Sequence, residues 1–196
     1  MVRSTLIAFL VLATNAAASA EDLAPPKSET IDLRNMSIEF DRFENRTVAK
    51  TQWTPAEKCD ISLTLLSEAI GKDWSGAYSI ALGFSSSSDE WQYLTSHQLS
   101  VLVDGKKVEM GPLDHDGKVG DGYVMEFMWT TDRVSLASLV TLSEADLAEF
   151  RIFTTECVFP ESILEAAADL SEMIEKDQAK RKVKQPQPKK SLPTKK

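Results

Sequence analysis

The chain has 196 residues and a formal net charge of −8, which fits one domain of ordinary size with terminal segments to spare. Its two cysteines exclude a dense disulfide scaffold, and no apolar run reaches the roughly 18 residues of a membrane-spanning helix. The charge is uneven, because residues 21–175 hold 29 acidic and 12 basic residues, whereas residues 176–196 hold nine basic residues and one acid. The acidic body should repel nucleic acids, so we expect no specific nucleic-acid binding by the domain.

Residues 1–20 have the pattern of a secretory signal peptide. Arg3 gives a positive start, an apolar run covers residues 6–13, and Ala18-Ser19-Ala20 is typical of a cleavage site for signal peptidase. The apolar run is too short to cross a membrane, so we expect no transmembrane segment after cleavage. The sequence therefore predicts a periplasmic or secreted protein.

Export changes the interpretation of the two cysteines. Cys59 and Cys157 form an even pair in a chain predicted to enter an oxidising compartment, where such pairs seldom stay reduced. We therefore expect a disulfide between them. Two separate buried thiols are the alternative, because a free cysteine behaves as a small apolar residue.

Residues 21–35 are polar and contain two adjacent prolines, which predicts a flexible leader before a single globular domain over residues 36–176. Inside that domain, apolar side chains alternate with small or polar ones, as expected for half-buried strands. Two polar stretches, residues 85–90 and 111–122, are predicted loops. The predicted strands are residues 36–41, 47–53, 61–65, 78–84, 99–103, 106–110, 123–129, 147–153 and 156–159.

The turns and helices complete the predicted fold. Asp104-Gly105 predicts a two-residue hairpin turn, and Ser135 is a predicted N-cap of a short helix. Pro160 opens a second helix, with an apolar stripe at three- and four-residue spacing. These elements predict a β-rich α+β fold: an antiparallel β-sandwich or strongly bent sheet of about eight short strands, one short helix and a C-terminal amphipathic helix. The stripe consists of Ile163, Ala167, Leu170 and Ile174.

Four short segments carry a resemblance to a known group of proteins: residues 40–47, 103–106, 149–152 and 156–159. In sequence they read Phe-Asp-Arg-Phe-Glu-Asn-Arg-Thr, Val-Asp-Gly-Lys, Glu-Phe-Arg-Ile and Glu-Cys-Val-Phe. The chain resembles an uncharacterised family of exported bacterial β-rich domains over roughly residues 36–176. That family has no established activity, so the resemblance implies export and a β-rich fold but no catalytic residues.

The main candidate for chemistry is the loop that contains Asp114, His115, Asp116 and Asp121. An imidazole between carboxylates can hold a metal or be oriented for catalysis. Asp and Gly also favour turns, so a plain hairpin loop is the other interpretation. The loop fails the calcium spacing of an EF-hand, and the chain has only two histidines, no G-x-S-x-G elbow and no nucleotide-binding glycine motif. We expect no cofactor.

Trp91 and Tyr93 are candidates for an exposed aromatic surface that binds a sugar or a peptide. Both follow the predicted loop that ends at Glu90. The alternative is that the aromatic residues fill the core of the sandwich.

Residues 177–196 are rich in lysine and proline and predict a disordered basic tail. Such a tail could tether the domain to anionic envelope polymer or to lipid head groups; a solvated tail without function is the alternative. We therefore expect an exported, noncatalytic binding or structural domain of the cell envelope. The alternative is a hydrolase or metal-dependent enzyme centred on the Asp114-His115-Asp116 loop. The basic residues assigned to the tether are Lys180, Arg181, Lys182, Lys184, Lys189, Lys190, Lys195 and Lys196.

Overall fold

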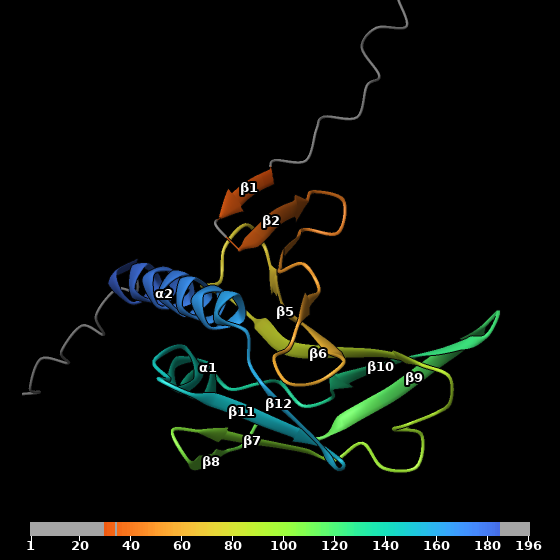
Figure 1. Ribbon diagram of the computed structural model, residues 1–196. Coiled ribbons are helices and arrows are strands. Elements are labelled where there is room, and N and C mark those ends of the chain that lie inside the picture. Colours follow the sequence, from red (N-terminus) through yellow and green to blue (C-terminus); the bar gives the residue numbers. More distant parts are fainter. Residues whose placement is uncertain (1–29, 34, 185–196) are drawn as a thin grey trace, which may run out of the picture.

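The computed structural model describes residues 30–33 and 35–184, which form two antiparallel sheets and two helices (Figure 1). Sheet A has the strand order β1-β2-β3-β5-β6-β10-β9, with β4 paired to β5, and sheet B has the order β12-β11-β7-β8. Sheet A comprises β1 (Thr30–Leu33), β2 (Met36–Asp41), β3 (Arg46–Lys50), β4 (Thr54–Pro55), β5 (Ile61–Ile70), β6 (Tyr78–Ser88), β9 (Leu113–Gly120) and β10 (Tyr123–Thr130). Sheet B comprises β7 (Leu99–Val103), β8 (Lys106–Val108), β11 (Ala148–Ile152) and β12 (Thr155–Val158), and the helices are α1 (Leu136–Ser143) and α2 (Glu161–Lys184).

The core lies between one face of sheet A and a layer made of sheet B and the helices. Apolar side chains at alternate positions of β5 and β6 point to this face, and Leu63 pairs with Phe84 across the two strands. The ring of Phe84 also lies 5.3 Å from that of Phe150 on β11, so the two sheets meet there. This arrangement confirms the predicted β-rich α+β, sandwich-like fold.

Local sequence explains the hairpin and the helix starts. Asp104 and Gly105 both have positive φ values, of 51° and 75°, as a two-residue turn between β7 and β8 requires. Ser135 caps α1, because its side-chain oxygen accepts a hydrogen bond from the backbone N–H of Ser138 at 3.0 Å. Helix α2 begins directly after Pro160, and the whole predicted apolar stripe is buried.

The ends of the domain differ from the sequence prediction. Strand β1 lies inside the predicted leader, and α2 continues to Lys184, through the first part of the predicted disordered tail. The apolar stripe ends at Ile174, but polar contacts hold the next turns of the helix. Asp177 accepts a hydrogen bond from the backbone N–H of Trp74 at 3.1 Å, and Arg181 donates one to the backbone oxygen of Ser75 at 2.7 Å. The predicted signal peptide and residues 185–196 of the predicted tail lie outside the described residues.

Two predicted loops are strands. Strand β6 continues to Ser88 because Ser85–Ser88 pairs with β10, and residues 113–120 form β9. Aspartate and glycine disfavour strands, so the sequence of β9 does not indicate one. Its pairing with β10 over eight residues supplies the stabilisation that its composition lacks. The resulting β9–β10 hairpin extends from the far end of the larger sheet (Figure 1).

Cys59 and Cys157 form the predicted disulfide. Cys59 lies just before β5 of sheet A and Cys157 lies in β12 of sheet B, so the bond joins the two sheets. A disulfide of this kind persists in oxidising compartments and favours a location outside the cytoplasm. Neither helix in the described ranges combines the length and the apolar character that a membrane span needs.

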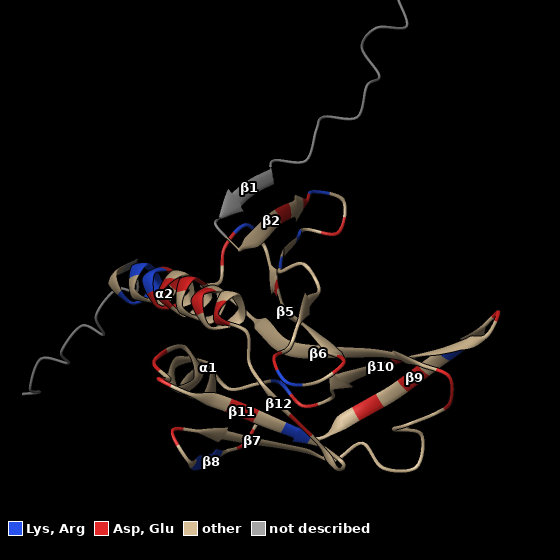
Figure 2. Ribbon diagram, viewed as in Figure 1, with Lys and Arg blue, Asp and Glu red and all other residues tan. Residues whose placement is uncertain are grey.

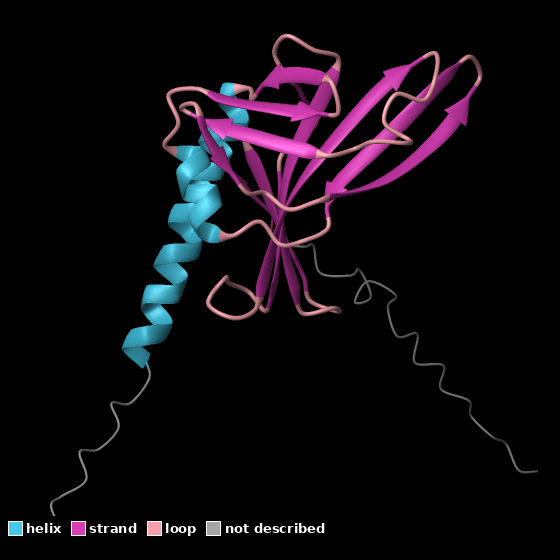
Figure 3. Cartoon of the chain, turned by 90° about the horizontal axis from the view of Figure 1, so that it is seen from below, coloured by secondary structure: helices cyan, strands magenta, loops and turns pink. Residues whose placement is uncertain are grey.

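Basic residues gather at the C-terminal end of α2, whereas acidic residues are spread over the rest of the domain (Figure 2). Seen from below, the last turns of α2 project past the sheets (Figure 3). Lys180, Arg181 and Lys182 are all on this end of the helix. The positive charge of the chain is therefore displaced from its acidic body.

Candidate functional site

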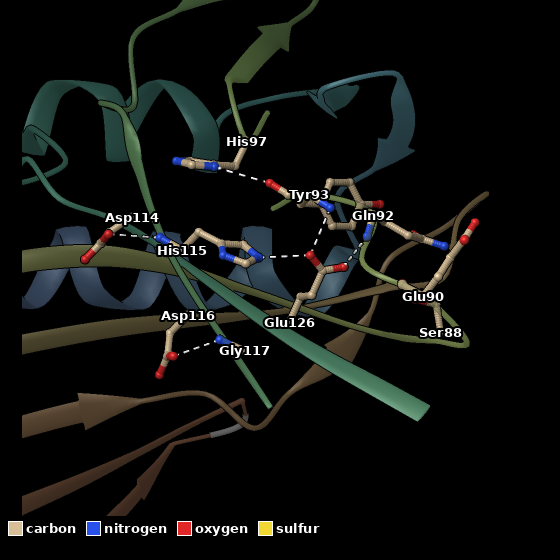
Figure 4. A network of polar contacts seen from close by, with 10 residues as sticks. All are labelled: Ser88, Glu90, Gln92, Tyr93, His97, Asp114, His115, Asp116, Gly117 and Glu126. Carbon is tan, nitrogen blue, oxygen red and sulfur yellow. Dashed lines mark hydrogen bonds and ion pairs between the residues drawn. The ribbon is translucent and has the colours of Figure 1, made fainter. Parts of the chain in front are cut away.

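The candidate metal loop forms part of a strand, which separates its side chains. Asp114, His115 and Asp116 are consecutive in β9, so the two carboxylates point to the face opposite the imidazole (Figure 4). Each carboxylate accepts a hydrogen bond from the next backbone N–H, that of His115 at 3.0 Å and that of Gly117 at 2.8 Å. Asp121 lies in the turn after β9. The four residues therefore do not converge on one point.

The partner of His115 is Glu126 on the neighbouring strand β10. The Nε2–H of His115 donates to Oε1 of Glu126 at 2.9 Å, and the two side chains are 7% and 0% exposed (Figure 4). A buried carboxylate is costly unless hydrogen bonds satisfy it. Glu126 meets that requirement with three donors, because Oε2 also accepts from the backbone N–H of Gln92 at 2.8 Å and Oε1 from that of Tyr93 at 2.9 Å.

Rings from the β6–β7 connection, residues 89–98, close over this pair. The imidazole of His97 is stacked on that of His115, with centroids 5.6 Å apart and planes 23° apart. The Trp91 ring lies 5.9 Å from the His115 ring and occupies the space above Gly117, where a Cβ atom would come within 2.3 Å of it. Glycine at this position of β9 therefore admits the tryptophan. The connection is fastened to the β9–β10 hairpin by both rings and polar contacts.

Tyr93 extends the same attachment to sheet B, and it does not form the exposed surface predicted with Trp91. Its side chain is 2% exposed, and its hydroxyl donates to Oγ1 of Thr155 on β12 at 3.0 Å. Burial raises the pKa of this hydroxyl above its ordinary value of 10.0; the hydrogen bond to Thr155 lowers it, and the negative charges of Glu126 and Asp60 raise it. Trp91 is 38% exposed, and its ring packs against Gly117 of the β9–β10 hairpin.

An imidazole bound to a carboxylate is also part of many catalytic sites. A catalytic role for His115 therefore depends on whether a nucleophile or a metal site lies beside it. A hydrolase needs a nucleophile within hydrogen-bond reach of the imidazole. Ser86 lies directly opposite Glu126 in the register of β6 and β10, and its buried hydroxyl has no hydrogen-bond partner among the described residues. Within the same residues, no group of three or more His, Cys, Asp or Glu side chains is placed to hold a metal.

Sequence reasoning missed Glu126, although the sequence holds a signal for it. It is the only charged residue in the apolar strand β10, and a lone carboxylate in such a strand must find donors if it is buried. Two of those donors are backbone N–H groups of residues more than 30 positions away, and the third, His115, lies on the neighbouring strand. The sequence therefore indicates that Glu126 needs donors but not which residues supply them.

A second cluster occupies the opposite face of sheet A. Trp53, which follows β3, meets Trp129 of β10 with ring centroids 5.6 Å apart at 67°, and Phe127 with centroids 6.3 Å apart at 59°. Trp53 is 41% exposed, and Trp129 and Phe127 are half-buried. These three residues form an aromatic cluster on this face, separate from Trp91 and Tyr93.

Comparisons of the chain with protein-family models, with curated proteins and with solved structures found no match.

Proposed function

We propose that this chain is an exported, noncatalytic binding or structural domain of the cell envelope, tethered by its basic C-terminal segment to anionic polymer or lipid head groups. The observation that carries the proposal is the position of the positive charge. Helix α2 holds Lys180, Arg181 and Lys182 at its projecting end, and four further lysines follow in residues 185–196. A cluster of this size attracts an anionic surface by about 1 kcal/mol per basic residue near that surface.

Periplasmic or secreted location belongs to the same proposal. It is supported by the disulfide between Cys59 and Cys157 together with the signal-like pattern of residues 1–20. The acidic residues of the domain body support the tether as well. They should keep the body away from anionic surfaces and leave contact to the end of α2.

The test is co-sedimentation of residues 21–196 with phosphatidylglycerol vesicles, with phosphatidylcholine vesicles as the neutral reference. We expect binding to the anionic vesicles at about 20 mM salt and a steep loss toward 150 mM, where the Debye length is about 8 Å. A variant that ends after Lys184 should bind much less. A full-length variant with glutamine at positions 189, 190, 195 and 196 should behave like the truncated one, because it keeps the length and loses only the charge.

Equal retention of these variants and the unaltered protein would contradict the tether. Lys106→Gln is the matched control, because it removes one exposed positive charge from the β7–β8 turn, away from α2. It should leave vesicle binding unchanged.

The alternative function, a hydrolase or metal-dependent enzyme centred on His115, has one supporting observation, the 2.9 Å contact between its imidazole and the Glu126 carboxylate. That function requires substrate to reach a ring that is 7% exposed and covered by two others. Loss of a measured hydrolytic activity in His115→Gln, with the fold intact by circular dichroism, would favour this alternative over the binding domain.

A further inference from the structure

A groove of about 720 Å³ is lined by Lys50, Thr64 and Trp129, which lie on the face of sheet A opposite the His115–Glu126 pair. Residues of β2 and β4 and Ser162, in the first turn of α2, complete its lining. Trp53 and Trp129 belong to its lining, so the exposed aromatic cluster opens directly into it. The volume lies within the range of sites that bind small ligands.

The two tryptophans stand at a steep angle and give the groove two aromatic walls. Their planes differ by 67°, and the six-membered ring of Trp129 fills the space above Gly83 of β6, where a Cβ atom would come within 2.5 Å of it. Glycine weakens the interior of a strand, and here it allows an aromatic ring to lie close to the sheet. The position of the Trp129 ring therefore depends on the glycine at position 83 of β6.

The polar side chains that line the groove differ in whether they have hydrogen-bond partners. Thr51 and Thr64, at the floor, bond to each other with oxygens 3.1 Å apart. By contrast, the side chains of Lys50, Gln52 and Ser162 have no hydrogen-bond or ion-pair partner within the part of the chain that the structure describes. These three provide an ammonium, an amide and a hydroxyl group that can bind a ligand.

The charge of the groove is unusual for this domain. Acidic residues outnumber basic ones by more than two to one over residues 21–175, yet the described lining includes no aspartate or glutamate and one cation, Lys50. A ligand with neutral hydroxyl groups or a carboxylate meets no like charge on these lining side chains.

We propose that this groove binds a short oligosaccharide. A sugar ring has a face of weakly positive C–H groups, which suits the negative face of an indole, and a rim of hydroxyl groups, which suits side chains such as Gln52 and Ser162. Lys50 favours a sugar that carries a carboxylate. This site is separate from the C-terminal tether, since none of the tether residues lines it.

The test is titration of residues 21–196 with three probes, cellotriose, chitotriose and trigalacturonate, followed by tryptophan fluorescence and calorimetry. We expect saturable binding of at least one probe and a lower Kd for trigalacturonate than for the neutral sugars. Trp53→Ala should raise the Kd by about tenfold or more, as removal of a central tryptophan does at many interfaces. Lys50→Gln should weaken trigalacturonate binding and leave the binding of a neutral sugar unchanged.

Tyr123→Ala is the matched control. Tyr123 is 45% exposed on β10 and its ring lies over Gly120, but it does not line the groove. This variant should bind as the unaltered protein does. Trp129→Phe accompanies Trp129→Ala, so that a folded variant with a smaller ring is available if the alanine variant unfolds.

Failure of all three probes to bind would overturn the proposal, and so would equal weakening by Tyr123→Ala and Trp53→Ala. Truncation after Lys184 should leave the Kd for every probe unchanged. A loss of vesicle binding without a loss of sugar binding would therefore contradict neither claim, whereas loss of sugar binding on truncation would contradict the groove.

Discussion

The polar groups on the two faces of β10 differ in their hydrogen-bond partners. On the inner face, Glu126 is fully buried and receives three hydrogen bonds, from His115 and from two backbone N–H groups. On the outer face, Trp129 borders a groove where Lys50 and Gln52 have no partner within the described residues. A buried polar group with all its partners holds a fold together, while an exposed one can exchange its bound water for a ligand. The hydrogen bond between His115 and Glu126 therefore stabilises the fold, and ligand recognition is expected on the other face.

The largest effect is expected on the inner face. Glu126→Ala leaves His115 and the backbone N–H groups of Gln92 and Tyr93 without their acceptor, so it should lower the free energy of unfolding by about 3–5 kcal/mol. Urea denaturation measures the loss, and sugar binding by the folded fraction should not change. His115→Ala, which removes one of the three donors, should cost much less. A cost of less than about 1 kcal/mol for Glu126→Ala would show that Glu126 does not anchor the connection.

A pair of glycine variants separates the two faces. Gly117→Ala places a methyl group against Trp91, and Gly83→Ala places one against Trp129; each should cost about 1–3 kcal/mol through overpacking. The first should accelerate amide exchange in residues 89–98 and leave sugar binding intact. The second should weaken sugar binding and leave that exchange unchanged. Identical behaviour of both variants in the two assays would remove the distinction between the faces.

Alkaline pH provides a smaller effect that is confined to the inner side. Burial raises the pKa of Tyr93 in the folded state, so the folded protein holds this proton more tightly than the unfolded chain does. The stabilisation from Tyr93 is therefore complete below about pH 10 and is lost as the pH rises through the pKa of the folded state. Urea midpoints measured between about pH 8 and pH 11 should fall more steeply for the unaltered protein than for Tyr93→Phe. Parallel curves would contradict a buried, titrating hydroxyl.

The smallest effect is expected at the C-terminus. Truncation after Lys184 should shift the Tm by no more than a few degrees, because the contacts of α2 with the β5–β6 turn remain. Truncation after Lys176 removes Asp177 and Arg181 and should lower the Tm further. Equal Tm values for the two truncations would place the end of the folded domain at Lys176, as the apolar stripe alone predicts.

The sequence predicts elements where one local rule dominates. The Asp104-Gly105 turn follows from backbone geometry, and the buried stripe of α2 follows from helical spacing. Strand β9 could not be predicted in this way, since its aspartates and glycines resemble a turn and only β10 makes it a strand. The last turns of α2 are similar, because they depend on Trp74 and Ser75, about 100 residues away.

The same limit applies to the sites. A histidine between two aspartates is conspicuous in the sequence, but alternation along a strand sends neighbouring side chains to opposite faces. Glu126, Trp53 and Trp129 carry no motif, and they meet their partners only through strand register and sheet packing. The sequence shows which side-chain types are present, but it does not predict which of them come into contact.

The disulfide between Cys59 and Cys157 has a consequence for the order of events during folding. The two cysteines are 98 residues apart, and Cys157 belongs to β12, the last of the strands that the structure describes. Of the twelve strands that the structure describes, eleven precede the strand that carries the second sulfur, so synthesis from the N-terminus supplies those eleven first. Any strand pairing that takes place before Cys157 is synthesised therefore proceeds without the covalent bond. A chain interrupted before residue 157 cannot form the bond and keeps only noncovalent contacts between its strands.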